Sequence, residues 1–600
     1  MRARHVMGLG FAGVFLLTLS LAAANSDVAD AAMRKDRTAV QGLLQKGANV
    51  NAAQSDGARA IHWAVYNGDL EMTKVLIAAG ADVKVANRNG STPLWLASTN
   101  GDAAIIRALL DGGANPNESL PLGRTPLMLA SRTGALDAMR VLIDRGANLN
   151  AKDTERGTTP MMWAADQGHA TAVRLLIERG ADFAVRSAPA VRGRGPALGK
   201  SSDPRASVKR QVDAIIAEQG QLPDLSQLRA AGDQNNAGGA RGNANANNAD
   251  NNDGDDQGDA AAAGAGFGGG GRGGRQAQTD GGQLTPLIYA ARANSIETVR
   301  VLLDAGADIN QVTGYGWSPL LVATQNRFYQ LGKYLMEKGA NVNLANKGGW
   351  TPLYLATDNR NIEGGDYPVR PTDLDDLEYI KLLLANGADV NARMIDSSET
   401  RTVFTNQWLD ERGATAFLRA SQSGDLQLMK LLLEHGADPK ITTNLNVTAL
   451  QVAAGIGWVE GITSERSKEE TVEAVRLLLD LGLDPNAQAL TGRVALHGAG
   501  HKGATEVVKL LVSRGAKMDV RDWGNTDNRG SPELAAHTWL PVDYADGLVR
   551  VGVQSAIAHP ETGKVLRDLM KQAGLNPPPE GRTLDSICIV EICSINYNPK

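Results

Sequence analysis

Residues 123–153 read GRTPLMLASRTGALDAMRVLIDRGANLNAKD. Thr125 is a good helix N-cap, because its hydroxyl can accept a hydrogen bond from a backbone N–H of the first turn, and Pro126 suits the first helical position. The apolar residues that follow predict a short helix ending at Gly134 and a second helix ending at Gly146. The Asn and Asp residues beyond favour a turn. The unit is therefore two short antiparallel helices and a projecting hairpin, with too much apolar surface to leave exposed and too little to form a core alone.

This unit recurs along the chain: Thr92 and Thr125 begin successive copies 33 residues apart. The Thr-Pro-Leu start, or a close variant of it, is found at Thr92, Thr125, Thr159, Thr285, Ser318 and Thr351, and looser copies begin at Ala60, Thr415, Thr448, Ala495 and Pro541. The closing Gly-Ala-Asn or Gly-Ala-Asp is found at Gly47, Gly80, Gly113, Gly146, Gly180, Gly306, Gly339, Gly387 and Gly436. In many copies, the N-cap residue, the proline, the apolar periodicity and the terminal glycine thus keep the same relative positions.

A repeat of this length and motif resembles the ankyrin repeat family over roughly residues 28–577, apart from insertions. The resemblance implies an all-α fold: an α-solenoid of about 12 helix-pair repeats with β-hairpin fingers, whose inner helices and hairpins form a concave binding surface. The periodicity itself predicts stacked helix pairs that contact only their nearest neighbours.

A long insertion divides the repeats into two blocks, residues 25–187 and residues 283–577. Between them, residues 188–282 are mostly Asn, Gly, Asp and Ala, and we expect most of this stretch to be disordered because it has too little apolar surface to offset the entropy of ordering. A short helix is predicted within it at 206–218. A C-terminal tail, residues 578–600, follows the second block.

The insertion is expected at the tip of one hairpin. Gly180 and Pro286 lie 106 residues apart where 13 is the regular distance, so 93 residues are extra. We predict one unbroken solenoid with a large loop, in which Leu175 lies near Val299 or Val301. Two separate stacks, the first capped by the short helix within the insertion, are the alternative, because a stack that ends needs a cap.

The first 24 residues have the layout of a secretory signal peptide. Arg2 and Arg4 precede an apolar run, residues 6–21, and three alanines lie before Asn25. An uncleaved anchor is the alternative, although the run is short for a bilayer span. No later segment is long and apolar enough to cross a membrane, so we expect an exported protein, periplasmic or extracellular, without a membrane span once residues 1–24 are removed.

The chain has two cysteines, Cys588 and Cys593. An exported protein permits a disulfide between them, and we predict this disulfide. Because they are five residues apart, the bridge requires a turn between them. Two reduced, partly buried thiols are the alternative.

The net charge and the motifs limit the classes of function that we expect. A net charge of −5 and a pI near 6.0 provide no basic footprint for nucleic acid. His497 and His501 are four residues apart, which suits a zinc pair, but no third ligand lies at a suitable spacing. The sequence contains no His-Glu-x-x-His, Gly-x-Ser-x-Gly or Walker-type loop. We therefore predict no catalytic residue, no metal and no cofactor.

Candidate partner-binding residues follow from the period, because the last positions of each first helix should lie on the exposed inner face. These are Tyr66, Asn67, Thr99, Asn100, Arg132, Asp166, Gln167, Arg292, Gln325, Asn326 and Asp358, with Asn359, Gln422 and His501 in the later repeats. Hairpin tips add Arg88, Tyr315, Trp317 and Trp350, and a loop insertion adds Trp408. Tyr, Trp and Arg are the residue types that anchor interfaces. Ordinary solvated positions are the alternative reading.

Our leading hypothesis is an exported, monomeric, non-catalytic scaffold that binds a protein partner on the concave surface. A second hypothesis is a secreted effector or enzyme-associated subunit that uses titratable groups of the C-terminal inserts, namely Asp410, Glu411, His537, Asp543 and His559. A third is small-molecule or glycan binding by the aromatic residues of the inserts, which are Tyr367, Phe404, Trp408, Trp458, Trp523 and Trp539.

Overall fold

The computed structural model describes most of both repeat blocks. The described residues are 26–190, 281–361, 370–395, 409–461, 463–464, 466–522, 538–549, 551 and 557–583. The chain divides into unit 1, Met1–Ser187, and unit 2, Ala188–Lys600, and each is considered by itself. The predictions of a signal peptide at 1–24, a helix at 206–218, a disordered insertion and a disulfide between Cys588 and Cys593 fall outside the described residues and stay predictions.

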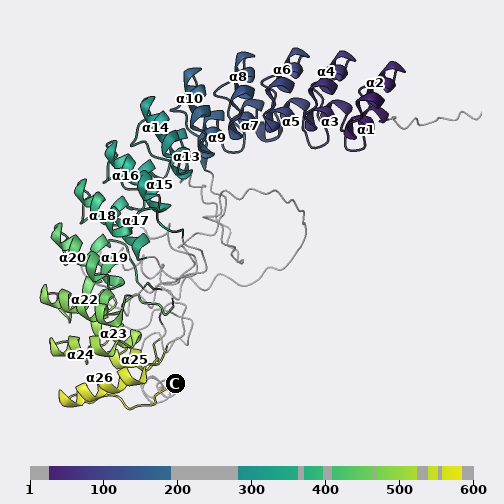
Figure 1. The fold of residues 1–600 in the computed structure, drawn as a ribbon. Helices are drawn as coiled ribbons and strands as arrows, with labels where there is room; N and C mark the ends of the chain where they lie inside the picture. Colours follow the sequence, from purple (N-terminus) through teal and green to yellow (C-terminus); the bar gives the residue numbers. More distant parts are fainter. Residues whose placement is uncertain are drawn as a thin grey trace, which may run out of the picture. The chain divides into compact units, whose positions relative to one another are not determined.

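Unit 1 contains five helix pairs in its described part. They are α1 (Asp27–Met33) with α2 (Arg37–Gln45), α3 (Ala60–Tyr66) with α4 (Leu70–Ala78), α5 (Pro93–Asn100) with α6 (Ala103–Asp111), α7 (Pro126–Arg132) with α8 (Leu136–Asp144), and α9 (Pro160–Asp166) with α10 (Ala170–Glu178); a 3₁₀ turn, η1 (Pro121–Gly123), precedes α7. The first helices form one row, the inner row, and the second helices form an outer row (Figure 1).

Unit 2 repeats this arrangement with seven pairs in its described part. They are α13 (Pro286–Arg292) with α14 (Ile296–Asp304), α15 (Pro319–Gln325) with α16 (Tyr329–Glu337), α17 (Pro352–Arg360) with α18 (Asp376–Ala385), α19 (Ala416–Gln422) with α20 (Leu426–Glu434), α21 (Ala449–Ala454) with α22 (Lys468–Asp480), α23 (Ala495–Lys502) with α24 (Thr505–Ser513), and α25 (Pro541–Ala545) with α26 (Pro560–Gln572). Odd-numbered helices again form the inner row (Figure 1).

The predicted caps explain where the inner helices begin. The Thr92 hydroxyl accepts a hydrogen bond from the Trp95 N–H at 3.0 Å, and Pro93 takes the first helical position. The second helix of the pair begins in the same way, with the Asp102 carboxylate accepting from the Ile105 N–H at 3.0 Å. Most of the described helices are short, about two turns, and the longest, α22 and α26, have 13 residues each.

Asparagine side chains clamp each hairpin to the next repeat. The Asn391 side chain donates to the Gly436 carbonyl at 3.0 Å and accepts from the Asp438 N–H at 2.8 Å. The same two-way bonding to the following repeat is made by Asn51, Asn117, Asn343 and Asn486. One amide thus supplies a donor and an acceptor at once, which fixes the register between neighbouring repeats.

The projecting fingers are turns more than regular β-hairpins. In the described residues the strands are β1 (Pro189–Ala190) and β2 (Gly281–Gly282), which pair antiparallel, so the two ends of the interval 191–280 lie side by side. Other fingers are joined to their neighbours by single backbone bonds, such as the Arg88 N–H to the Asp56 carbonyl at 3.0 Å. One bond per finger aligns the row but is too few for a regular ladder.

Candidate binding surface

The exposed ends of the inner helices form a continuous polar and aromatic surface in unit 1, which we call the inner face. Tyr66 is 63% exposed, the largest fraction among its neighbours on α3. The residues exposed at the same positions of the next repeats are Thr99, Asn100, Arg132, Asp166 and Gln167, and Arg88 is exposed on a finger. Asn67 is half-buried, because its side chain donates to the Ala32 carbonyl at 3.2 Å.

Aromatic rings form the floor of this inner face. The Trp63 indole N–H donates to Gln54 at 2.6 Å, and its ring meets Tyr66 edge-to-face with centroids 5.8 Å apart. Farther along, the guanidinium groups of Arg124 and Arg132 both lie over the Trp163 ring, at 5.3 and 5.6 Å from its centroid. Cation–π contact holds these cations against the surface instead of leaving them free in solvent.

The first inner helices of unit 2 are partly accessible. Arg292 is half-buried and lies over the Tyr289 ring at 5.6 Å, and Asn326 is exposed. Gln325, Tyr315 and Trp317 are half-buried. The prediction that Trp350 is a finger-tip anchor is wrong: it is 0% exposed and packs edge-to-face on Tyr354 at 4.9 Å.

From α17 onward, the inner positions of unit 2 are buried, which contradicts the sequence-based expectation of exposure. Asp358 is 9% exposed, Asn359 6%, Gln422 4% and His501 1%. The reason is that parts of the chain's own loops lie over this face. Their apolar residues join one cluster with the inner helices and fingers of unit 2; the cluster consists of Leu321, Trp350, Tyr354, Leu355, Met394, Leu409, Ala414, Leu418, Val447, Val452, Ile456, Val459, Ala489, Trp539, Tyr544, Leu548, Val549 and Val551.

The best-defined of these loops is residues 455–461, which we call the covering segment. A Cβ on Gly457 would lie 2.7 Å from the Cβ of Leu409, which precedes α19, and 3.4 Å from the Nε2 of Gln422, the last residue of α19. Its Trp458 ring meets His501 of α23 edge-to-face, with centroids 5.7 Å apart. The covering segment therefore extends over α19 and α23, on both sides of the helix α21 from which it begins.

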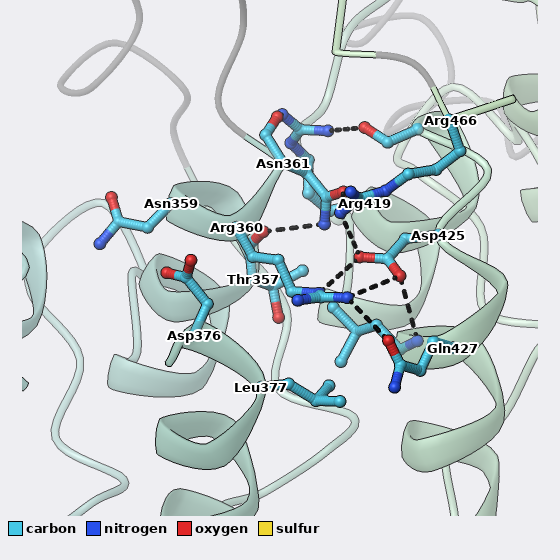
Figure 2. Close-up of polar contacts among 12 residues, drawn as sticks. Thr357, Asn359, Arg360, Asn361, Asp376, Leu377, Arg419, Asp425, Gln427 and Arg466 are labelled. Atoms are coloured by element: carbon cyan, nitrogen blue, oxygen red, sulfur yellow. Dashed lines mark hydrogen bonds and ion pairs between the residues drawn. The ribbon is translucent and has the colours of Figure 1, made fainter. Parts of the chain in front are cut away.

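A largely buried set of ion pairs lies beside the covering segment, and we call it the arginine cluster; its members are Asp358, Arg360, Asn361, Arg419, Asp425 and Arg466. Figure 2 labels five of them: Arg360, Asn361, Arg419, Asp425 and Arg466. Arg419 is 1% exposed and donates to Asp358 at 2.7 Å. It also donates to the Asn361 carbonyl and to the Ser423 hydroxyl. Because α17 supplies Asp358 and α19 supplies Arg419, the pair binds two inner helices together.

Asp425 is the second anion of the arginine cluster and is 2% exposed. It accepts from Arg360 at 2.8 Å and from Arg466 at 2.9 Å, and it also caps α20 by accepting from the Leu428 N–H at 3.2 Å (Figure 2). Arg466 donates in addition to the Asn361 side chain at 3.2 Å. A buried carboxylate needs such partners, because desolvation without them is costly.

The two histidines of the suggested zinc pair have structural surroundings. His497 accepts from the Val494 N–H at 2.9 Å and bonds the Trp539 carbonyl at 3.1 Å, so both ring nitrogens bond to backbone. Burial lowers the pKa of His497 and of His501 to about 4. In the described parts of the chain, no three metal-ligating side chains are grouped.

The candidate catalytic groups of the C-terminal inserts are dispersed. Asp410 pairs with Arg412 at 3.0 Å near α19, whereas Asp543 of α25 pairs with Arg582. Glu411 is buried beside the first of these and His559 directly precedes α26. His537 lies outside the described residues. The inner helices α21 and α23 separate the two acidic positions, so these groups do not form one site.

Among the described residues, the aromatic side chains of the inserts provide no exposed ring on which a glycan could stack. Trp458 is 9% exposed and Trp539 is 2% exposed. Tyr367, Phe404, Trp408 and Trp523 lie outside the described residues. A sugar ring needs an exposed aromatic face, which neither of the described tryptophans provides.

Sequence reasoning missed the arginine cluster and the covering segment. A signal was present for one of them: Arg419 occupies the helix position that Leu129 and Val322 fill in other repeats, where a charge requires a buried partner. The covering segment had only a weak signal, an apolar Ile-Gly-Trp-Val run after a shortened helix.

Comparisons place these repeats among known proteins. Over 145 residues the chain is 32% identical to Ankyrin repeat and SOCS box protein 16 of Mus musculus, covering 24% of this chain and 30% of that protein. Over 61 residues it is 39% identical to Serine/threonine-protein kinase 12 of Arabidopsis thaliana, covering 10% and 13%. Over 50 residues it is 44% identical to Protein PhlB of Serratia liquefaciens, covering 8% and 22%. The chain thus spans less than a third of the length of each of these relatives.

A family model for ankyrin repeats in three copies matches residues 28–120, 101–187, 287–394 and 417–522, more than half of the chain. Among the described helices none has the length and apolar character needed to cross a bilayer. The matched segments coincide with the stacked helix pairs, and the chain belongs to the ankyrin repeat family.

Proposed function

We propose that this protein is an exported, non-catalytic scaffold that binds a protein partner through the inner face of unit 1. The observation that carries the proposal is the contrast in exposure. Tyr66, Arg132 and Asp166 are exposed in unit 1, whereas the equivalent positions from α17 onward lie under the chain's own loops. A partner can therefore reach the first surface without displacing any loop residue that the structure describes in unit 1.

The chemistry of the unit 1 inner face supports recognition of a protein. It combines an exposed Tyr, half-buried Trp rings and arginines held over one of those rings. These residue types contribute most of the binding energy in protein interfaces. The rings and caps are already ordered, so binding requires little further loss of conformational entropy.

Export rests on the sequence of residues 1–24, and a non-catalytic role rests on the dispersal of the titratable groups. The alternative of a secreted effector or enzyme-associated subunit remains the second hypothesis. The mouse relative has a name that pairs ankyrin repeats with a SOCS box, and the plant relative is named as a kinase. Neither activity is proposed for this chain, because the alignments cover a minority of those proteins.

To test the proposal, the mature chain is purified from its native compartment together with any bound protein. This is done for wild type, for an outer-face variant and for an inner-face variant. Wild type and the outer-face variant Arg107→Ala should retain a stoichiometric companion, because Arg107 is exposed on the outer helix α6. The inner-face variant Tyr66→Ala/Arg132→Ala should lose it. Equal retention by the inner-face and outer-face variants would contradict the proposed surface, and turnover by the isolated chain would contradict a non-catalytic role.

A further inference from the structure

The inner face under the covering segment combines the buried polar positions Gln422 and His501 with a large apolar part. Leu355, Leu418 and Val452 come from α17, α19 and α21 and share one cluster with Ile456 and Val459 of the covering segment. A continuous apolar face of this kind would be a binding site if it were open, because large exposed apolar patches are characteristic of interaction surfaces.

The covering segment begins at Gly455, with φ 129°, and ends at Gly461, with φ 72°, conformations that glycine adopts easily and other residues rarely do. Just beyond, Thr463 donates its N–H to the Val459 carbonyl at 3.0 Å, and its hydroxyl accepts from the Val459 N–H at 2.9 Å. These bonds link the covering segment to Thr463, which lies just after it, so they survive only if Thr463 moves together with the segment.

The closed arrangement leaves a polar group unsatisfied. Gln422 is 4% exposed, and neither its amide oxygen nor its amide nitrogen has a hydrogen-bond partner. The Gly457 backbone lies directly against this amide. A buried amide without partners is unfavourable. A different backbone lying in the same place, with a C=O and an N–H turned toward Gln422, would satisfy both atoms.

Arg466, which follows the covering segment in the sequence, is held by charge. It pairs with Asp425, which also binds Arg360, so the buried carboxylate loses one of two cations if Arg466 moves away with the segment. An incoming ligand that carries its own guanidinium can replace it. A ligand that replaces the covering segment and Arg466 should therefore resemble them, as an extended apolar segment followed by an arginine.

We propose that the covering segment and Arg466 are a built-in ligand that closes a second peptide-binding face, spanning α17 to α23, and that an extended apolar peptide segment bearing an arginine displaces them. Gln422 pairs with the main chain of the incoming segment, and Asp425 binds its arginine. The displaced residues 455–461 move outward about Gly455, and Thr463 and Arg466 move with them. This face is distinct from the inner face of unit 1, and its test does not depend on the partner proposed there.

The test uses the full mature chain and a fluorescent peptide with the sequence of residues 455–467. The variant Arg466→Gln weakens the closed state, whereas Arg476→Gln removes a cation that is 43% exposed on α22 and serves as the matched control. We expect Arg466→Gln to bind the peptide at least about tenfold more tightly than wild type or Arg476→Gln, because apparent affinity scales with the open fraction. Adding Gln422→Ala to Arg466→Gln should reverse most of this gain.

Two results would overturn the proposal. The first is that wild type and a folded Arg466→Gln variant bind the peptide with equal affinity. The second is that the Arg466→Gln variant binds the peptide equally well when the arginine of the peptide is replaced by glutamine. Hydrogen exchange on wild type provides a check that needs no variant. Amides of residues 456–461 should exchange at least about tenfold faster than those of α19 and α21, because the segment opens locally. Equal exchange rates would mean that the face opens only on global unfolding.

Discussion

Arg419 occupies a helix position that is apolar in neighbouring repeats, and its guanidinium is 1% exposed. It is tolerated because Asp358, the Asn361 carbonyl and Ser423 surround it. A buried ion pair contributes little net stability compared with an apolar pair, but removing one partner leaves an uncompensated buried charge. The arrangement thus fixes which helices lie side by side more than it strengthens the unit.

Asp358→Ala should therefore destabilise unit 2 by about 3 kcal/mol, because Arg419 loses its counter-ion in a buried site. Asp358→Leu/Arg419→Leu should recover part of this loss, since apolar replacement of both partners is often nearly neutral. Denaturant unfolding of each variant measures the difference. The control is Asp137→Ala, whose pair with Arg140 is exposed and whose loss should change the free energy of unfolding by less than about 1 kcal/mol. Equal effects of the two single substitutions would contradict this account.

The single residue His497 also makes the free energy of unfolding depend on pH. Burial lowers its pKa to about 4, and its two backbone bonds suit the neutral ring. In the unfolded chain the pKa is about 6.5, so below that pH the unfolded state binds a proton that the folded state does not. Stability is therefore fully present above pH 6.5 and is lost as the pH falls toward 4, by roughly 3 kcal/mol for one such histidine.

Urea unfolding of wild type between pH 7 and pH 4 measures this loss. His497→Gln should be less stable at pH 7 but should show a shallower dependence on pH, because one of the groups that takes up a proton on unfolding is absent. A wild-type free energy of unfolding that stays constant from pH 7 to pH 4 would show that the buried histidines do not control acid stability.

Helix packing at the end of unit 2 depends on glycine. A Cβ on Gly498 of α23 would lie 2.5 Å from the Ile456 N and 2.8 Å from the Gly455 carbonyl carbon, and one on Gly500 would lie 2.5 Å from the Pro541 carbonyl oxygen. The backbones of α21, α23 and α25 therefore approach more closely than side chains would allow. This close approach also places the start of the covering segment against α23.

Gly498→Ala should destabilise unit 2 by about 1–3 kcal/mol, because the added methyl group forces neighbouring backbone apart. Gly42→Ala is the matched control: nothing lies within 4 Å of a Cβ there, and Gly42 is in the middle of α2. That substitution should stabilise unit 1 by about 0.5–1 kcal/mol, because alanine loses less backbone entropy in a helix. The two substitutions should thus have opposite signs in thermal unfolding, and a shared sign would contradict the packing argument.

Each helix pair in a stack contacts mainly its neighbours, so a local change should stay local in the whole molecule. Asp358→Ala should raise the hydrogen-exchange rates of α17, α19 and their adjoining loops. Amides of α3, α5 and α7 in unit 1 should keep their wild-type rates, because helix pairs in a stack are coupled mainly to their nearest neighbours. Mass spectrometry of peptides from both units measures this, and a uniform increase across the chain would show that the repeats unfold as one cooperative block.

In the whole molecule, the loops decide how accessible the inner face of each unit is. Both units have the same helix-pair architecture, but unit 1 presents polar and aromatic inner positions, whereas unit 2 buries its inner positions from α17 onward under residues 455–461 and other loop residues. Two inner faces built from one repeat motif therefore have different accessibility. This is why the proposed partner site and the proposed second peptide face have separate experiments.

The amino-acid sequence by itself determined the repeat: Thr92 and Pro93 begin an inner helix where their capping chemistry predicts, and Asn391 sits at a fixed distance after Gly387 because the register is local. Only the tertiary structure decided which inner positions reach solvent. Trp350 and Gln422 occupy positions that the period marks as exposed, yet loop residues distant in sequence cover them. Caps and periods are set by neighbours along the chain, whereas coverage depends on where an irregular loop folds back, and no local pattern specifies that.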